Sequence, residues 1–244
     1  MKEWQGKRYW LVGASDGLGK ELAMMLSRAG VELVLSARNE AALNELAAAL
    51  PGKSQVAAMD IRSGDSVAAA AEAAGTIDGV VLMAGTATSI SALDWDADKA
   101  VEIADTNFTG VLRVLGHVMP GLAERDAGHV VLVGSLAAYR GLARNVGYAA
   151  SKAAVQSLAE SMYADLRGTG IQVQIVNPGY FRTAMTAANT GKMPFLMEVE
   201  DAAREVFEHM MDDSFKKAFP APLSWVVRLA QFLPDWLYYR TIGR

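Results

Sequence analysis

The sequence predicts an α/β fold, in which one doubly wound parallel sheet carries helices on both faces. Short runs of β-branched and other apolar residues recur along the chain without polar alternation, which is typical of strands covered on both faces. Longer segments with helical periodicity separate these runs. Repeated strand, helix and strand units imply parallel strands joined by right-handed crossovers.

Six strands are expected, and the segments between them supply the helices. The expected strands cover residues 9–12, 31–35, 55–59, 77–83, 129–133 and 171–176. In residues 39–50, Leu43 and Leu50 share one helical face. Asn39 can cap the first turn of this helix, and Pro51 ends it.

We expect one domain over residues 1–244, because no linker, low-complexity tract or charge run divides the chain. The connection over residues 178–200 is longer than typical loops and has weak periodicity. It is therefore a candidate substrate lid.

The composition excludes several classes of function. The chain is 52% hydrophobic and 20% charged with a net charge of -4, which indicates an ordered globular protein and argues against a nucleic-acid partner. It has no cysteine, and His117, His129 and His209 are too scattered for a metal pattern. We see neither a signal peptide nor a run long enough to span a bilayer, so we expect a cytoplasmic protein.

Three glycines follow the first strand with the spacing Gly-x3-Gly-x-Gly. Gly13 permits a tight turn, Gly17 lets a pyrophosphate approach backbone N–H groups, and Gly19 permits close contact between helix and strand. A nucleotide-triphosphate P-loop is excluded, because it needs glycine in place of Ala14 and serine or threonine in place of Glu21. The functional interpretation is a dinucleotide loop, and the alternative is a glycine-rich turn without a ligand.

The ends of the second and third strands bear on the choice of cofactor. Arg38 lies where a carboxylate would bind the ribose of NAD, and an arginine there suits the 2′-phosphate of NADP. We therefore expect NADP, with NAD as the alternative because Asp16 adds negative charge nearby. Arg38 is otherwise a solvated surface residue. Asp60 closes the third strand and either accepts the adenine amino group or caps a turn.

Tyr148 and Lys152 lie one helical turn apart, on one face of a helix that runs toward Arg167. A free tyrosine titrates near pH 10, and a nearby cation lowers its pKa. We therefore expect Lys152 to lower the pKa of Tyr148 and to suit it for proton transfer. Ser135 follows the fifth strand, at the edge where such sheets bind ligands. A buried tyrosine, a surface lysine and a turn serine are the alternatives.

Together these residues resemble the classical short-chain dehydrogenases/reductases, and the resemblance covers nearly the whole chain. It implies a Rossmann-type NAD(P)-binding oxidoreductase acting on a small-molecule carbonyl or alcohol, usually as a homo-oligomer (dimer or tetramer). The matching motifs, in chain order, are the loop of Gly13, Gly17 and Gly19, then Asn107, Ser135, Tyr148 with Lys152, and the segment from Pro178 and Gly179 to Thr183.

The resemblance assigns a role to each matching residue. Tyr148 is the expected acid/base, Lys152 holds the nicotinamide ribose, Ser135 steadies the substrate oxygen and Asn107 holds a water that links Lys152 to solvent. Thr183 is expected to bind the nicotinamide carboxamide. The full set of expected cofactor contacts is Gly13, Ser15, Asp16, Gly17, Leu18, Gly19, Arg38, Asp60, Ile61, Ala84, Gly85, Asn107, Tyr148, Lys152, Pro178, Gly179 and Thr183.

Two residues depart from the family pattern. Val12 stands where the family usually has threonine, and Met83 stands where it usually has asparagine. Both positions normally support structure around the cofactor, so we expect altered binding with the chemistry unaffected. No metal ligand is expected.

The expected substrate lid is apolar and rich in methionine, which suggests a bulky hydrophobic substrate. The alternative is that these side chains pack on the protein itself. They are Phe181, Met185, Met193, Phe195, Leu196 and Met197.

The C-terminal extension, residues 216–244, is basic and rich in aromatic residues within an acidic protein. Ser224, Arg228 and Gln231 fall on one stripe of a helix there and leave a wide apolar face. That face either packs on its own subunit or a partner subunit, or touches an anionic membrane. Two alternatives to a reductase that acts away from membranes therefore stay open. One is a nucleotide-binding regulatory protein without catalysis, and the other is a lipid ketoreductase at a membrane surface.

Overall fold

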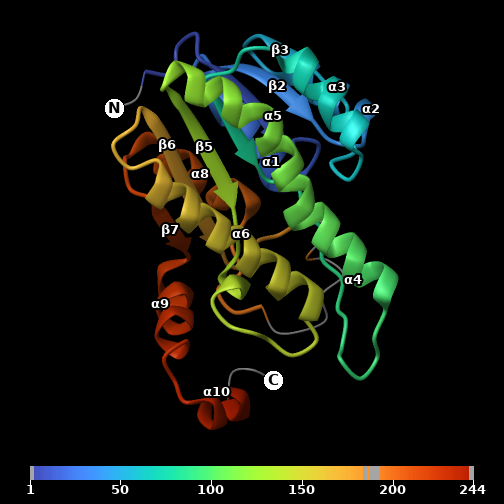
Figure 1. Ribbon diagram of the computed structural model, residues 1–244, viewed down its shortest axis with the longest axis vertical. Coiled ribbons are helices and arrows are strands. Elements are labelled where there is room, and N and C mark those ends of the chain that lie inside the picture. Colours follow the sequence, from blue (N-terminus) through green and yellow to red (C-terminus); the bar gives the residue numbers. More distant parts are fainter. Residues whose placement is uncertain (1–2, 184–185, 187–192, 242–244) are drawn as a thin grey trace.

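Seven parallel strands form one sheet in the computed structural model, in the order β3-β2-β1-β4-β5-β6-β7 (Figure 1). The structure describes residues 3–183, 186 and 193–241. The strands are β1 (Arg8–Val12), β2 (Glu32–Ser36), β3 (Ser54–Val56), β4 (Gly79–Leu82), β5 (Gly128–Val133), β6 (Ile171–Pro178) and β7 (Lys216–Phe219). Strand order reverses at β1, so ligands are expected beyond the carboxyl ends of β1 and β4.

Helices connect the strands and extend the chain beyond the last of them. They are α1 (Gly17–Arg28), α2 (Glu40–Ala49), α3 (Gly64–Ala74), α4 (Ala97–Ala104), the π-helix η1 (Asp105–Thr109), α5 (Gly110–Arg125), the 3-10 helix η2 (Leu136–Ala138), α6 (Val146–Asp165), α8 (Val199–Met211), α9 (Ala221–Ala230) and α10 (Asp235–Thr241). Within the described residues, none of them is long and apolar enough to cross a membrane.

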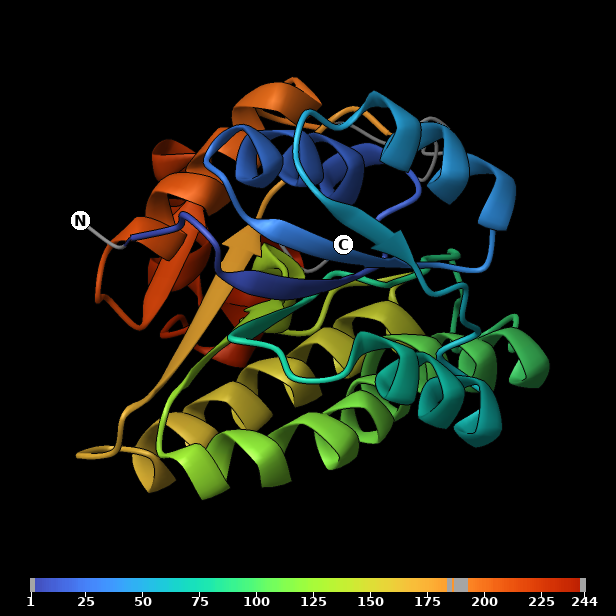
Figure 2. The ribbon, with the colours of Figure 1, turned by 90° about the horizontal axis from the view of Figure 1, so that it is seen from above.

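The two faces of the sheet are covered by different helices (Figure 2). On one face, α1, α2 and α8 enclose a cluster in which Leu22 and Val206 are fully buried. On the other, α3, α5 and α6 enclose a second cluster that contains Val114 and Ala159. The predicted α/β fold with helices on both faces is therefore confirmed.

Burial on both faces explains the apolar runs in the sequence. In β1, Trp10 belongs to one cluster and its neighbour Leu11 to the other, and both are buried. Side chains of successive strand residues point to opposite faces of the sheet. A strand covered by helices on both faces therefore carries apolar side chains on both of its faces. The helix predicted over residues 39–50 is also present as α2, and the Asn39 side chain accepts a hydrogen bond from the Ala42 amide (3.1 Å).

The prediction misses one strand and overextends another. β3 ends at Val56, although the sequence suggested a strand as far as residue 59. β7 was not expected, because Lys216 and Lys217 interrupt its apolar pattern. It is one of the two edge strands of the sheet, and its two lysines form ion pairs with Glu160 and with Glu205. Charged side chains are tolerated on an edge strand because it pairs with a neighbour on one side only.

Candidate active site

The glycine loop packs tightly against the strands around it. The Gly13 amide donates to the Ser36 carbonyl oxygen at the end of β2 (2.7 Å), and Gly13 has a φ of 96°. A Cβ on Gly13 would lie 2.5 Å from the Ala84 nitrogen, and one on Gly19 would overlap the Gly13 carbonyl oxygen. Only glycine fits at either position, and the loop leads directly into the start of α1, where the first N–H groups of a helix can bind an anion.

The loop also contacts the segment after β6. Gly17 has a φ of 51°, and a Cβ there would lie 2.9 Å from Cγ2 of Thr183. Leu18 is buried, Ser15 is partly buried and Asp16 is exposed. The structure therefore brings Thr183 to the glycine loop, 166 positions along the chain from Gly17.

Ser135 and Tyr148 meet at the carboxyl edge of the sheet. Ser135 follows β5, and Tyr148 lies in the first turn of α6. Burial raises the pKa of Tyr148, and a hydrogen bond between the two side chains opposes this effect. The Ser135 hydroxyl also accepts a hydrogen bond from the Ala137 amide (3.1 Å), which fixes its orientation.

Lys152 is almost fully buried below Tyr148. Its Nζ donates to the Val133 carbonyl oxygen (2.9 Å) and lies 6.0 Å from the centre of the Tyr148 ring. Burial lowers the pKa of Lys152 to about 8. The sequence suggested that Lys152 lowers the pKa of Tyr148, but the net direction in the structure is upward. Burial of the phenol outweighs the other influences, which the spacing of the two residues cannot reveal.

Asn107 connects this pair to a neighbouring loop. It lies in η1, a π-helix of the kind often found at functional sites. Its amide group exchanges hydrogen bonds with the Thr86 backbone (2.7 and 2.9 Å) and donates to Ser151 Oγ (3.0 Å). Ser151 in turn donates to the Tyr148 carbonyl oxygen (2.8 Å). Sequence reasoning missed Ser151 and Thr86, although Ser151 stands directly before Lys152.

The turn at Ala84 and Gly85 joins the two halves of the site. Ala84 packs against Gly13, and a Cβ on Gly85 would lie 3.6 Å from Lys152 Nζ and 3.4 Å from Asn107 Oδ1. The glycine loop and the group around Tyr148 therefore lie on either side of one short turn after β4.

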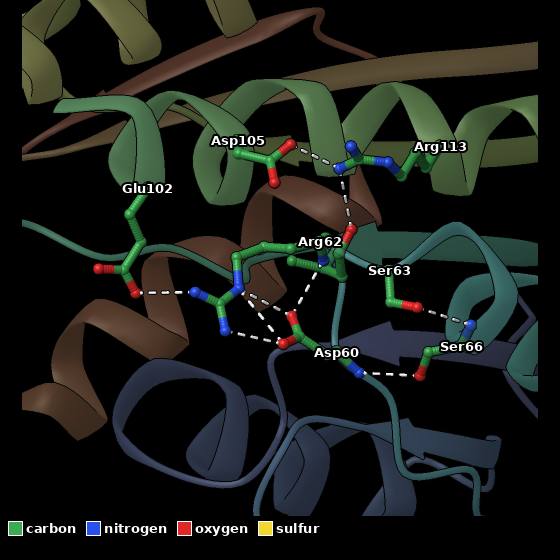
Figure 3. A network of polar contacts seen from close by, with 8 residues as sticks. Asp60, Arg62, Ser63, Ser66, Glu102, Asp105 and Arg113 are labelled. Atoms are coloured by element: carbon green, nitrogen blue, oxygen red, sulfur yellow. Dashed lines mark hydrogen bonds and ion pairs between the residues drawn. The ribbon is translucent and has the colours of Figure 1, made fainter. Parts of the chain in front are cut away.

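The carboxylate of Asp60 forms an ion pair with Arg62, a residue that the sequence analysis did not predict at the site (Figure 3). The Arg62 guanidinium binds both Asp60 oxygens (2.8 to 3.3 Å), and the Arg62 amide donates to Oδ1 (3.0 Å). These contacts lower the pKa of Asp60 to about 2. Arg62 also pairs with Glu102 (3.0 Å). Ile61 is buried beside this network, and Arg38 is exposed at the end of β2.

Comparisons with known proteins agree on one family. The model of the short chain dehydrogenase family matches residues 7–193. The chain belongs to the short-chain dehydrogenase family. An uncharacterized oxidoreductase from Myxococcus xanthus is 36% identical over 98% of this chain and 97% of its own length. The predictions of the family and of an oxidoreductase enzyme are therefore confirmed.

Two solved structures share the fold of this short-chain dehydrogenase. A family member from Burkholderia phymatum in complex with NAD has a TM-score of 0.88 at 23% identity, and covers 100% of this chain and 98% of its own. A short chain dehydrogenase from Burkholderia cenocepacia in complex with NADP has a TM-score of 0.87 at 23% identity, and covers 100% of both chains.

Of the two departures from the family pattern in this short-chain dehydrogenase, Val12 is buried in the core and Met83 is half-buried against it. Val12 and Met83 pack in the clusters on opposite faces of the sheet. The contact that supports the Ala84 turn uses backbone alone, because the Val12 carbonyl oxygen accepts hydrogen bonds from the amides of Met83 and Ala84 (both 2.9 Å). The turn therefore forms without the usual polar side chains.

Asn177 is a second polar residue that sequence reasoning missed. It is fully buried at the end of β6, and its Oδ1 accepts a hydrogen bond from the Ser135 amide (3.0 Å). Its Nδ2 donates to Gln156 Oε1 on α6 (3.0 Å). Asn177 thus ties Ser135 to the helix that carries Tyr148. Its place directly before the Pro178-Gly179 pair was the available signal.

Part of the predicted substrate lid, including Met185, lies outside the described residues. Pro178 pairs with Phe219 of β7, and the Gly179 amide donates to the Phe219 carbonyl oxygen (2.7 Å). Phe181 and Met197 pair with each other and pack on the core, as the alternative interpretation held. In the other predicted lid positions, Met193 and Leu196 are half-buried and Phe195 is exposed.

A cavity of about 600 Å³ lies beside the site, lined by residues 137–143, by the start of α6 including Ala149 and Ala153, and by Tyr239 of α10. Ser135, Tyr148 and Lys152 are not in its lining. Within the described residues, no group of three or more His, Asp or Glu side chains is placed to hold a metal ion.

Proposed function

We propose that this protein transfers a hydride between NADP(H) and a carbonyl compound or secondary alcohol, with Tyr148 as the acid/base. The observation that carries the proposal is the hydrogen bond between Tyr148 and Ser135 above the buried ammonium of Lys152. This arrangement holds one exchangeable proton at a phenol, beside a hydroxyl that can bind the same substrate oxygen.

The residues of the glycine loop fit a dinucleotide. The loop leads into the start of α1, where the first N–H groups of a helix can bind an anion, and glycine alone fits at positions 13 and 19. Thr183 touches Gly17, and Lys152 and Asn107 flank Gly85, so polar groups surround the path from the loop to Tyr148. A nicotinamide bound along this path would supply or accept the hydride.

Three features support Tyr148 as a proton donor in reduction. Its raised pKa keeps the phenol protonated at neutral pH. The Ser135 oxygen accepts from the Ala137 amide and its hydroxyl is hydrogen-bonded to Tyr148, so the serine can exchange that bond for one to the substrate oxygen. Lys152, with a pKa of about 8, is mostly charged at pH 7 and stabilises the phenolate left after proton transfer.

The position of Arg38 supports NADP over NAD. Arg38 is exposed after β2, and within the described residues it takes part in no ion pair. Its guanidinium lies close enough to Asp60 to lower the pKa of that carboxyl, and it is exposed to solvent where a phosphate could bind it. Asp60 is already bound by Arg62, which leaves less of its carboxylate for the adenine amino group. In this proposal Asp60 serves mainly to hold Arg62, and its contact with adenine is of lesser weight.

A hydrophobic substrate is the remaining part of the proposal. Leu196 is half-buried and Phe195 is exposed in the described part of residues 178–200, while Phe181 and Met197 support that segment from the core. A single domain over residues 1–244, a cytoplasmic location and a homo-oligomer stay predictions.

The test is a panel of ketones of increasing apolar size, each incubated with the protein and NADPH or NADH. We expect NADPH consumption with formation of the alcohol, faster for the larger apolar ketones. Binding of NADPH without turnover of any ketone would favour the regulatory alternative. Tighter binding of NADH than of NADPH would contradict the interpretation of Arg38.

A further inference from the structure

Helix α9 buries a polar side chain and exposes large apolar ones. The polar residue Ser224 is buried with Ala230, whereas Trp225, Val226 and Leu229 are each more than half exposed. Further along the chain, Phe232 between α9 and α10 is 81% exposed and Trp236 of α10 is 69% exposed. We call Trp225, Val226, Leu229, Phe232, Trp236 and Tyr239 the α9–α10 face. Within one chain these side chains are therefore largely uncovered, and packing on a partner subunit stays the alternative to a membrane.

The inward side of the segment is fixed by Arg140, in the loop between Ser135 and Tyr148. Its Nη1 donates to the carbonyl oxygens of Ala230 (3.2 Å), Gln231 (3.2 Å) and Leu233 (2.6 Å). Its guanidinium stacks on the Tyr238 ring at 4.1 Å. Turning the apolar face inward would break these contacts, so its exposure is a property of the packed structure and not of a loose tail.

The α9–α10 face is flanked by positive charge. Arg228 and Arg240 are exposed, and within the described part of the chain neither takes part in an ion pair. The nearest acid along the chain, Asp235, is bound by Arg140. This end of the molecule is therefore basic, in a protein whose net charge is -4.

We propose that the α9–α10 face docks on an anionic lipid bilayer. Tryptophan and arginine favour the boundary between headgroups and acyl chains, where the ring is buried and the guanidinium binds phosphate. Apolar residues such as Leu229 and Phe232 add burial, and the two arginines add attraction to anionic lipid. A second copy of the chain fits the face less well. A symmetric contact would bring four arginines together, and the Asp235 carboxylates there already pair with Arg140.

The location of the face suits a substrate that is dissolved in the membrane. Helices α9 and α10 extend from the carboxyl end of the sheet, the end that carries Ser135 and the start of α6 (Figure 1). Docking would place the entrance of the site toward the lipid. This last step depends on the proposed function, whereas docking itself does not, so the Tyr148→Phe variant should still bind vesicles.

The experiment is flotation of the full chain with two kinds of vesicle, phosphatidylcholine alone and phosphatidylcholine mixed with phosphatidylserine. We expect binding to the mixed vesicles and much weaker binding to phosphatidylcholine. Replacing both arginines, R228A with R240A, should lower binding to mixed vesicles about 30-fold, since each contributes a factor of about five near an anionic surface. The exposed Arg167 at the far end of α6 provides the matched control, R167A, which should bind like the wild type.

A second pair of variants tests the apolar part of the face. Replacing Leu229 and Phe232 with serine should abolish flotation, while Leu112→Ser, an exposed leucine on α5, should not. Circular dichroism checks that each variant is folded. Absence of flotation of the wild type with mixed vesicles would overturn the proposal. So would dissociation of a wild-type oligomer by the Leu229 and Phe232 replacements, which would assign the face to a second copy.

Discussion

The site around Tyr148 and the α9–α10 face are built in opposite ways. At the site, polar side chains are buried and hold one another, as Asn107, Ser135 and Asn177 do. On the face, large apolar side chains such as Leu229, Phe232 and Trp236 are each more than 60% exposed. The difference teaches that the proposed site is held by contacts within one chain, whereas the proposed docking face offers side chains for a contact outside it. Changes in one region should therefore leave the other unaffected.

The largest effect is expected from Lys152→Met, which keeps the length of the side chain and removes its charge. Turnover should fall by about a thousandfold, within the range that general acid–base catalysis contributes. Vesicle flotation should not change. Steady-state kinetics measures this loss, and Lys99→Met, at an exposed ion pair on α4, is the control. Turnover within threefold of the wild type would show that the buried ammonium has no part in the reaction.

The glycine loop should be nearly as sensitive. Gly19→Ala places a Cβ onto the Gly13 carbonyl oxygen, so we expect the free energy of unfolding to fall by about 3 kcal/mol and NADPH affinity to fall with it. Urea denaturation and fluorescence titration measure the two quantities. Gly64→Ala in α3, where the added methyl meets nothing within 4 Å, is the control and should not destabilise. Equal behaviour of both variants would contradict the tight packing of the loop.

The pH dependence of stability should reveal the buried lysine. The pKa of Lys152 is lowered from 10.5 to about 8, so the unfolded chain binds more protons than the folded one between these values. The free energy of unfolding should therefore gain about 2 kcal/mol from this residue as the pH rises from 8 toward 10. Urea denaturation at several pH values, compared with Lys152→Met, isolates this gain. An identical pH profile in the variant would show that the lysine is not desolvated.

A smaller effect is expected at the edge of the site. Arg38→Ala should weaken NADPH binding about tenfold and leave NADH binding within twofold, because only NADPH carries the 2′-phosphate. Isothermal titration with each cofactor measures the ratio, and Arg28→Ala at the end of α1 is the control. An equal loss for both cofactors would assign Arg38 to the general structure of the loop.

Substitutions on the α9–α10 face are expected to leave turnover unchanged. Replacing Leu229 and Phe232 with serine should leave turnover of a water-soluble ketone unchanged in the absence of vesicles. Kinetics without lipid measures this, beside the flotation experiment. A loss of turnover comparable to that of Lys152→Met would mean that the two regions are not separate.

The sequence predicted best those elements that are buried on both faces. It predicted least well those features that depend on which side of an element faces solvent. Strands such as β4 and β5 are covered on both faces, so composition alone located them. The two lysines of β7 interrupt its apolar pattern, so this edge strand was not predicted. The positions of polar residues along α9 do not show which side of the helix faces solvent. Spacing placed Tyr148 near Lys152. It could not show that burial raises the pKa of Tyr148 or that Arg62 occupies Asp60, because both depend on contacts that are distant in sequence or on solvent access.

The most direct test of the central claim is turnover by Tyr148→Phe, with the best ketone of the panel and NADPH. The account predicts a loss of about a thousandfold or more, with NADPH affinity within twofold of the wild type, since only the transferable proton is removed. Tyr163→Phe, at an exposed position on the same helix, should behave like the wild type. Wild-type turnover by Tyr148→Phe would contradict the proposed mechanism.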